Sequence, residues 1–165
     1  MFGENILEEK IKLLEEKMDD QQKWDQRLLD MAQFISGWSK DPSTQVGAVI
    51  VDEDNRIISV GYNGFAKKVK DSKNRLENRD VKYKMIVHGE INAILFANKS
   101  TKGCTLYTYP FMPCSNCAPI IINAGIKRVV SYLDNNPRWT ESFKLSTEQF
   151  SEADVELILV ERKES

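Results

Sequence analysis

GCTLYTYPFMPCSNCAPIIINAGIKRVVSYL, residues 103–133, has the pattern of a strand, a helix and a second strand in direct succession. An apolar run at 104–109 precedes a proline, an apolar helical run follows over 114–124, and a β-branched run covers 126–133. A strand–helix–strand succession of this length predicts two parallel strands joined by a crossover helix. The central stretch therefore indicates an α/β protein.

The flanking segments extend this pattern in both directions. A helix at about 139–150 and a strand at 155–160 follow it, and a helix at 88–98 precedes it. Further upstream, QVGAVIVD and RIISVGYN are rich in β-branched residues and flank EDN, which predicts an antiparallel hairpin. We therefore expect a five-stranded mixed sheet that begins with a hairpin and carries helices on both faces.

The N-terminal region predicts two helices. In residues 4–20, Leu7, Ile11, Leu14 and Met18 fall on one stripe among charged residues, as in an amphipathic helix. A second helix is expected at about 24–38. We expect the first helix to pack on its own domain, and a contact between subunits is the alternative.

Composition narrows the function classes. The chain has 165 residues of which 41% are hydrophobic, enough for one compact domain. Its 23 basic residues nearly balance 25 acidic ones, so binding to a nucleic-acid polymer is disfavoured. No apolar run reaches the ~18 residues of a membrane span, and MFGENILEEK lacks the pattern of a signal peptide. We expect a cytoplasmic protein without a membrane partner.

The cysteines and the single histidine suggest a metal site. Cys114 and Cys117 lie at the expected start of a helix, where the partial positive charge lowers the pKa of a thiol and favours the thiolate that zinc binds. Together with His88 they make three ligands, the number that leaves a catalytic zinc one open position. Glu90, near the same helix start as His88, is placed to handle protons. Cys104, in an apolar strand, is expected to be a small buried residue.

Each element of this site has a plainer explanation when taken alone. A lone histidine is often an ordinary core or surface residue, and CxxC also occurs as a redox pair. Taken together, H-x-E followed by P-C-x-x-C matches the pattern of the zinc deaminases, in which the glutamate is the general acid and base and is not a ligand. The 22 residues between Glu90 and Pro113 are enough for one helix and one strand, which would bring both helix starts together.

At these motifs the chain resembles the deoxycytidylate deaminases of the cytidine deaminase-like superfamily. The resemblance continues through SKDPSTQVGAVIVD, RIISVGYNGF, VKYKMIVHGEINAI and PCSNCAPIIINAGIKRVV, across about residues 39–130. It implies a three-layer α/β/α fold over a catalytic domain at 21–165, preceded by an N-terminal helical extension at 1–20. It further implies hydrolysis of dCMP to dUMP and ammonia for thymidylate synthesis, and a homo-oligomer, a hexamer or a dimer, regulated by dCTP and dTTP.

The resemblance also implies roles for individual residues. His88, Cys114 and Cys117 would hold zinc, and Glu90 would move protons. Substrate contacts are expected from the residues Asn63, Ser43, Thr44 and Gly89. Gly61 and Gly64 of GYNG would help to bind a nucleoside triphosphate effector, although a turn without a ligand explains these two glycines nearly as well.

Two features of this chain differ from the usual family pattern. Gly89 replaces the alanine of H-A-E, which raises the hypothesis that a 5-substituted cytosine fits. Residues 67–84 contain no cysteine or histidine for a second zinc, so one zinc per chain is expected.

The same run, residues 67–84, holds eight basic residues against three acidic ones, which suits a phosphate-bearing ligand or, alternatively, a solvated loop. We expect Trp139 and Phe143 to pack in the core, and a place in the lining of a pocket is the alternative.

Other functions remain open at this stage. Within enzymes, the alternative is a deaminase of another cytosine nucleotide or nucleoside, such as CMP, dCTP or 5-substituted dCMP. Outside enzymes, it is a zinc-stabilised nucleotide-binding module without turnover. A CxxC redox protein would leave His88 and Glu90 without a role.

Overall fold

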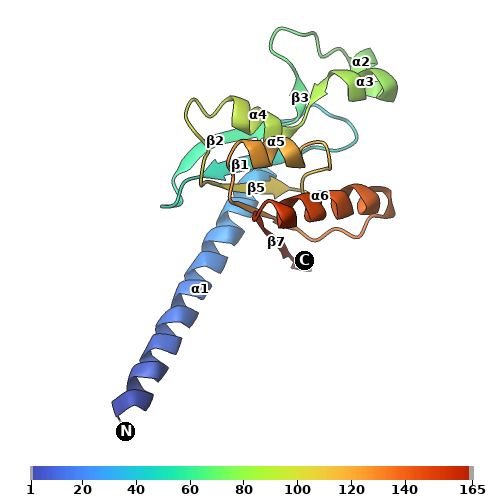
Figure 1. Cartoon of the computed structure of the whole chain (residues 1–165). Coiled ribbons are helices and arrows are strands. Elements are labelled where there is room, and N and C mark those ends of the chain that lie inside the picture. Colours follow the sequence, from blue (N-terminus) through green and yellow to red (C-terminus); the bar gives the residue numbers. More distant parts are fainter. Residues whose placement is uncertain (1, 164–165) are drawn as a thin grey trace.

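Five strands form one mixed sheet in the order β2-β1-β5-β6-β7 in the computed structural model, which describes residues 2–163 (Figure 1). The strands are β1 (Gly47–Val51), β2 (Ile57–Tyr62), β5 (Thr105–Tyr109), β6 (Arg128–Tyr132) and β7 (Glu156–Val160). β1 is antiparallel to both β2 and β5, whereas β5, β6 and β7 run parallel. The predicted hairpin, the parallel strands and the mixed sheet are confirmed.

Helices cover both faces of this sheet, which gives the expected three layers. On one face, α1 (Phe2–Ser36) packs through Leu28, Leu29 and Ala32 against alternate residues of β1, β5 and β6. The helices of the other face are α4 (Gly89–Leu95), α5 (Ala118–Asn123) and α6 (Thr140–Glu152). Neighbouring residues of β1 point to opposite faces, so Ile50 joins the core under α4 and α5 while Val49 joins the core under α1.

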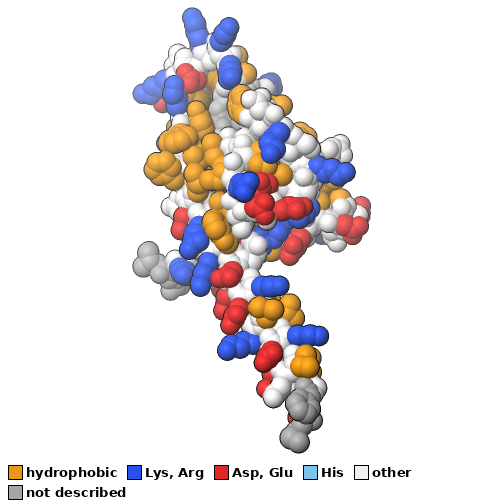
Figure 2. Space-filling model, turned by 90° about the vertical axis from the view of Figure 1, so that its left-hand side faces the viewer, with side chains coloured by type: hydrophobic (Ala, Val, Ile, Leu, Met, Phe, Trp, Pro, Cys, Tyr) orange, Lys and Arg blue, Asp and Glu red, His pale blue; other side chains and the backbone are white. Residues whose placement is uncertain are grey.

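The N-terminal region differs from the prediction, because α1 is one helix of 35 residues instead of two. No glycine or proline interrupts residues 20–24, and the Gln21 side chain donates a hydrogen bond to Asp25 one turn later, 3.0 Å away. Residues 3–24 are exposed throughout, and burial begins at Asp25. The expectation that the first stripe packs on its own domain is therefore wrong: this half of α1 projects away from the sheet (Figures 1 and 2).

The polar run after β2 is also more ordered than predicted. It contains α2 (Lys73–Glu77) and α3 (Arg79–Met85), and the short strands β3 (Gly64–Phe65) and β4 (Ile86–Val87) pair across its ends. The Asn78 side chain accepts a hydrogen bond from the backbone N–H of Val81 and so caps α3. This capped helix fixes the chain that leads into His88.

The helix expected at 114–124 begins later, as α5 at Ala118. Residues 115–117 form a turn in which the N–H groups of Cys117 and Ala118 both bond to the carbonyl of Cys114, at 3.1 and 3.0 Å. Pro119 has no N–H to donate to residue 115, so the regular helical ladder starts only after this turn. A 3₁₀ turn, η1 (Pro137–Trp139), leads into α6. None of the helices within residues 2–163 is long and apolar enough to cross a membrane.

Candidate active site

The starts of α4 and α5 bring the predicted metal ligands together. His88 has an extended backbone and is the residue from which α4 begins, and Glu90 lies in the first turn. Helix α4 can lie directly on β2 because residue 61 is glycine: a Cβ there would be 2.4 Å from both the carbonyl oxygen of Gly89 and the nitrogen of Ala93. This close packing fixes the height of His88 and Glu90 above the sheet.

The three candidate ligand atoms converge. The Nδ1 atom of His88 lies 3.1 Å from Sγ of Cys117 and 3.6 Å from Sγ of Cys114, and all three atoms are within 4.8 Å of one another. Tetrahedral zinc, with bonds of about 2.0–2.3 Å, holds its ligands about 3.3–3.8 Å apart. The observed separations fit such an ion with little adjustment.

The donor set also fits zinc chemically. Contact with Cys117, and then with His88, lowers the pKa of the Cys114 thiol to about 4, and the same contact raises the pKa of the Cys117 thiol. The contact between the two sulfurs therefore favours a thiolate at Cys114, and a dication bound beside both sulfurs would favour a thiolate at Cys117 as well. The hydrogen bond with Cys114 also raises the pKa of His88, although burial opposes it.

Glu90 is the buried carboxylate beside this cluster. It is 4% exposed, and its Oε2 atom is the buried side-chain oxygen that finds no hydrogen-bond partner among the described residues. Burial raises its pKa, with partial opposition from the charge of His88. A carboxyl group with a raised pKa holds a proton more readily than a free one, which suits a group that must both accept and donate protons in general acid–base catalysis.

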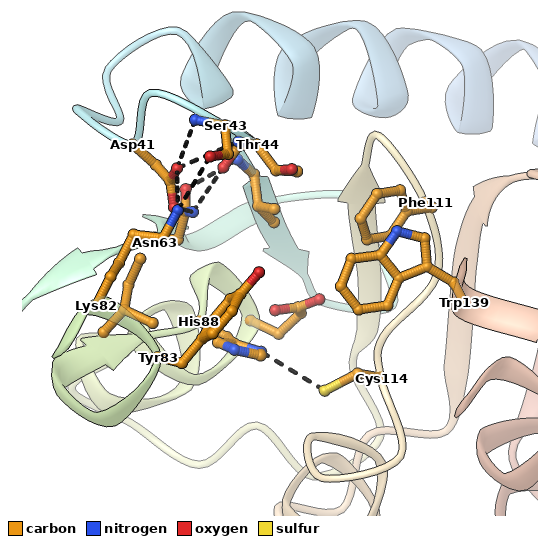
Figure 3. Close-up of a pocket in the computed structure, with 13 residues that line it drawn as sticks. Asp41, Ser43, Thr44, Asn63, Lys82, Tyr83, His88, Phe111, Cys114 and Trp139 are labelled. Carbon is orange, nitrogen blue, oxygen red and sulfur yellow. Dashed lines mark hydrogen bonds and ion pairs between the residues drawn. The ribbon is translucent and has the colours of Figure 1, made fainter. Parts of the chain in front are cut away.

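A pocket opens over His88, Glu90 and Cys114, and one of its walls is a buried polar network (Figure 3). The Nζ atom of Lys82 donates to Oδ1 of Asp41 at 3.0 Å and to Oγ of Ser43 at 3.2 Å. The amide of Asn63 donates to the carbonyl of Thr44 at 2.9 Å, and its oxygen accepts from the N–H of Val46, also at 2.9 Å. These bonds hold the loop between α1 and β1 against the pocket.

The opposite wall is aromatic. Phe111 and Trp139 line the pocket, with ring centres 5.5 Å apart, and Phe143 packs behind them. Figure 3 shows the rings of Phe111 and Trp139 across the pocket from Asn63 and Lys82, with His88 and Cys114 below. The arrangement suits a planar polar ring held between an apolar face and hydrogen-bonding groups.

Several sequence predictions can be compared with this pocket. Of the residues expected to contact the substrate, Ser43, Thr44 and Asn63 line the pocket and Gly89 does not. Gly61 and Gly64, which are expected at an effector site, lie outside it. A Cβ on Gly89 would lie 3.2 Å from a methyl carbon of Val46, so Val46 is the side chain that faces the missing methyl group. Gly61 serves the packing of α4, and the space around Gly64 is open. Cys104 lies in the core, as predicted.

Sequence reasoning missed Lys82, Tyr83 and Phe111 as pocket residues, and it placed Trp139 wrongly. Phe143 is buried as expected, but Trp139 faces the pocket. Lys82 was counted as part of a charged loop, although it is 2% exposed. The available signal was its place on a short helix: Lys82 and Ile86 are four residues apart, so they share the face turned toward the pocket.

A sheet of this topology, with a His/Cys/Cys cluster and a buried glutamate at two helix starts, is the arrangement of a zinc-dependent hydrolytic deaminase. The model of the cytidine and deoxycytidylate deaminase zinc-binding region matches residues 22–133. The chain belongs to this family, and one zinc ion per chain suits its cluster.

Individual relatives agree with this assignment. The chain is 46% identical over 138 residues to an uncharacterized deaminase in the luxG 3' region of Aliivibrio fischeri, covering 82% of this chain and 92% of the relative. It is 41% identical over 124 residues to deoxycytidylate deaminase of Mus musculus, covering 72% and 69%. The crystal structure of dCMP deaminase from the cyanophage S-TIM5 shares the fold, with a TM-score of 0.64, 21% identity, and coverage of 82% of this chain and 96% of that one.

Proposed function

We propose that this protein hydrolyses dCMP to dUMP and ammonia, and so supplies dUMP for thymidylate synthesis. The observation that carries the proposal is the meeting of His88, Cys114 and Cys117 beside the unpartnered carboxylate of Glu90, in a chain whose relatives include deoxycytidylate deaminases. In this proposal the histidine and both cysteines hold zinc. When bound, zinc acts as a Lewis acid that makes water nucleophilic near neutral pH.

The residues of the chain would manage the protons. Glu90 would accept a proton from the attacking water, which adds its oxygen to C4 of the cytosine ring. The carboxyl group would deliver this proton to N3. It would then accept the second proton from the new hydroxyl group on C4 and pass it to the amine, so that the C4–N bond breaks, a carbonyl forms and ammonia leaves. Because burial raises its pKa, Glu90 holds each proton firmly enough to deliver it in the next step.

The two walls support a nucleotide as the substrate. Phe111 and Trp139 offer an apolar surface to the base, and Ser43, Thr44 and Asn63 offer polar groups to the sugar and phosphate. The amide of Asn63 already holds the loop, so we propose that it acts on the sugar mainly by fixing Ser43 and Thr44 in place. Gly89 would contribute through its backbone only.

A substrate panel tests the proposal directly. Zinc-loaded protein should release ammonia from dCMP with a higher kcat/KM than from deoxycytidine, CMP or dCTP. If another member of the panel has the highest kcat/KM, that compound is the substrate. If none of them releases ammonia, the result favours a non-catalytic nucleotide-binding module. A kcat/KM for 5-methyl-dCMP as high as that for dCMP would support the hypothesis that Gly89 admits a 5-substituted ring, and a much lower value would remove it.

Regulation and cellular context complete the proposal. We propose a cytoplasmic homo-oligomer, a hexamer or a dimer, that responds to dCTP and dTTP through the segment of Gly61 and Gly64, with a catalytic domain at 21–165 and a helical extension at 1–20. The rate of dCMP deamination with and without these triphosphates and magnesium tests the effector role. An unchanged rate would remove it.

A further inference from the structure

The projecting half of α1 carries a large apolar surface that no other element within residues 2–163 covers. Six side chains there, between 47% and 64% exposed, are those of Ile6, Leu7, Ile11, Leu13, Leu14 and Met18. Figure 2 shows apolar side chains on this part of the helix among charged ones. A helix that exposes this much apolar surface in water is typical of an interaction site.

The spacing of the stripe is the same in both directions. Leu7, Ile11, Leu14 and Met18 follow one another at intervals of four, three and four residues, and Glu4 and Gln21 lie three residues beyond either end. A second copy running antiparallel therefore matches every layer: Leu7 meets Met18 of the second copy, Ile11 meets Leu14, and Glu4 meets Gln21. Such self-complementarity is the requirement of a two-fold interface.

The domain itself decides the direction of the second helix. From Asp25 onward the same face of α1 is buried against the sheet through Leu28 and Ala32. A parallel copy would have to continue over this face, where the sheet already lies. An antiparallel copy overlaps only residues 4–21 and places the two domains at opposite ends of the helix pair.

From these observations we infer that the projecting half of α1 binds the same segment of a second copy of this chain as an antiparallel helix pair. Burial of the four stripe side chains Leu7, Ile11, Leu14 and Met18 on both copies gives a small interface, at or below the lower end of the ~1,200–2,000 Å² of stable complexes. Ile6 and Leu13 lie roughly 100° or more around the helix from the centre of the stripe and stay outside the interface. The association is therefore reversible. The catalytic pockets remain open, because they lie on the domains and outside the helix pair.

Charges beside the stripe give the pairing a specific salt dependence. The antiparallel arrangement places Glu8 near Glu15 of the second copy, and Lys10 near Lys17. These groups are exposed, so salt screens their repulsion and strengthens the association. A parallel pair would instead place Lys10 near Glu15 and weaken with salt.

Sedimentation equilibrium of the full-length zinc-loaded protein tests whether this surface binds a second copy, because it measures the mass of the assembly in solution. Ile11→Asp should reduce the mass of the assembly by a factor of two, whether or not the domains also associate elsewhere. Glu16→Lys, which changes a charge on the opposite face of the same helix, should leave the mass unchanged. An Ile11→Asp protein with the mass of the wild type would overturn the proposal.

Disulfide cross-linking tests the direction. Leu7→Cys and Met18→Cys in one chain are about 16 Å apart along the helix, too far to bond to each other. The double variant should form a covalent dimer under mild oxidation, whereas either single variant and the wild type should not. A dimer from Leu7→Cys alone would show a parallel pair and overturn the antiparallel arrangement.

Discussion

The pocket contains two polar clusters that differ in how many of their groups have hydrogen-bond partners. In the wall, Lys82, Asp41 and Asn63 pair with one another and with the loop backbone. In the floor, an oxygen of Glu90 has no hydrogen-bond partner among residues 2–163, and the sulfurs of Cys114 and Cys117 lie beside Nδ1 of His88. The difference indicates separate tasks: the wall stabilises the fold, and the floor retains unsatisfied groups that an ion and a substrate can engage.

The largest effect is expected from removing a metal ligand in the floor. Cys117→Ala should lose both zinc and deaminase activity, because two remaining ligands hold zinc poorly and the nucleophile depends on the ion. Metal analysis together with ammonia release measures this. Cys104→Ala is the matched control, since that thiol lies in the core; full zinc occupancy in Cys117→Ala would contradict the assignment.

Glu90→Gln separates proton transfer from metal binding within the same cluster. The amide cannot exchange protons as a carboxyl group does, so the rate should fall by about 10²–10⁴-fold while zinc remains. Zinc content and kcat for dCMP, measured on the same sample, give both results. Retained turnover would show that another group moves the protons.

Substitutions in the wall of the pocket should change the free energy of unfolding. Lys82→Met leaves the buried carboxylate of Asp41 without its cation and should lower the free energy of unfolding by about 3–5 kcal/mol. Lys84→Met removes an exposed lysine two residues away and should change it little. Denaturant unfolding of zinc-loaded proteins compares the two. Equal stabilities would mean that the wall is not the structural cluster that its contacts indicate.

A second satisfied cluster, under α1, gives a smaller and pH-dependent effect. Burial alone would raise the pKa of Asp25, but hydrogen bonds from Arg128, Tyr107 and Gln21 outweigh it and leave the pKa below its usual value. The carboxylate therefore stabilises the fold above the unfolded pKa of about 4, and this stabilisation is lost as pH falls through the folded pKa.

Asp25→Asn tests the direction of this pH dependence of stability. The variant should be less stable than the wild type by about 1–3 kcal/mol at pH 7, since Arg128 loses a bidentate carboxylate. The difference should shrink as the pH is lowered below about 4. Thermal unfolding across this range measures it, with Asp30→Asn, an exposed residue of the same helix, as the control.

Much of the fold was predictable because its signals are local. β-branched runs mark each strand of the sheet, and the alternation of strands and helices specifies the parallel half. The metal cluster was predictable for a similar reason: few residue types bind zinc, and His88, Cys114 and Cys117 stand at helix starts. Trp139 and Lys82 were misjudged because an aromatic ring or a lysine has the same local pattern in a core, in a pocket or on a surface.

By itself, the sequence determined the α/β class, the mixed sheet and the identity of the zinc-binding and proton-transferring candidates, because periodicity and chemical type are properties of short segments. The tertiary structure alone decided that Lys82 is buried against Asp41, that Val46 fills the space beside Gly89, and that half of α1 projects without a partner. These outcomes depend on which distant segments meet, and that is set by the packing of the whole chain.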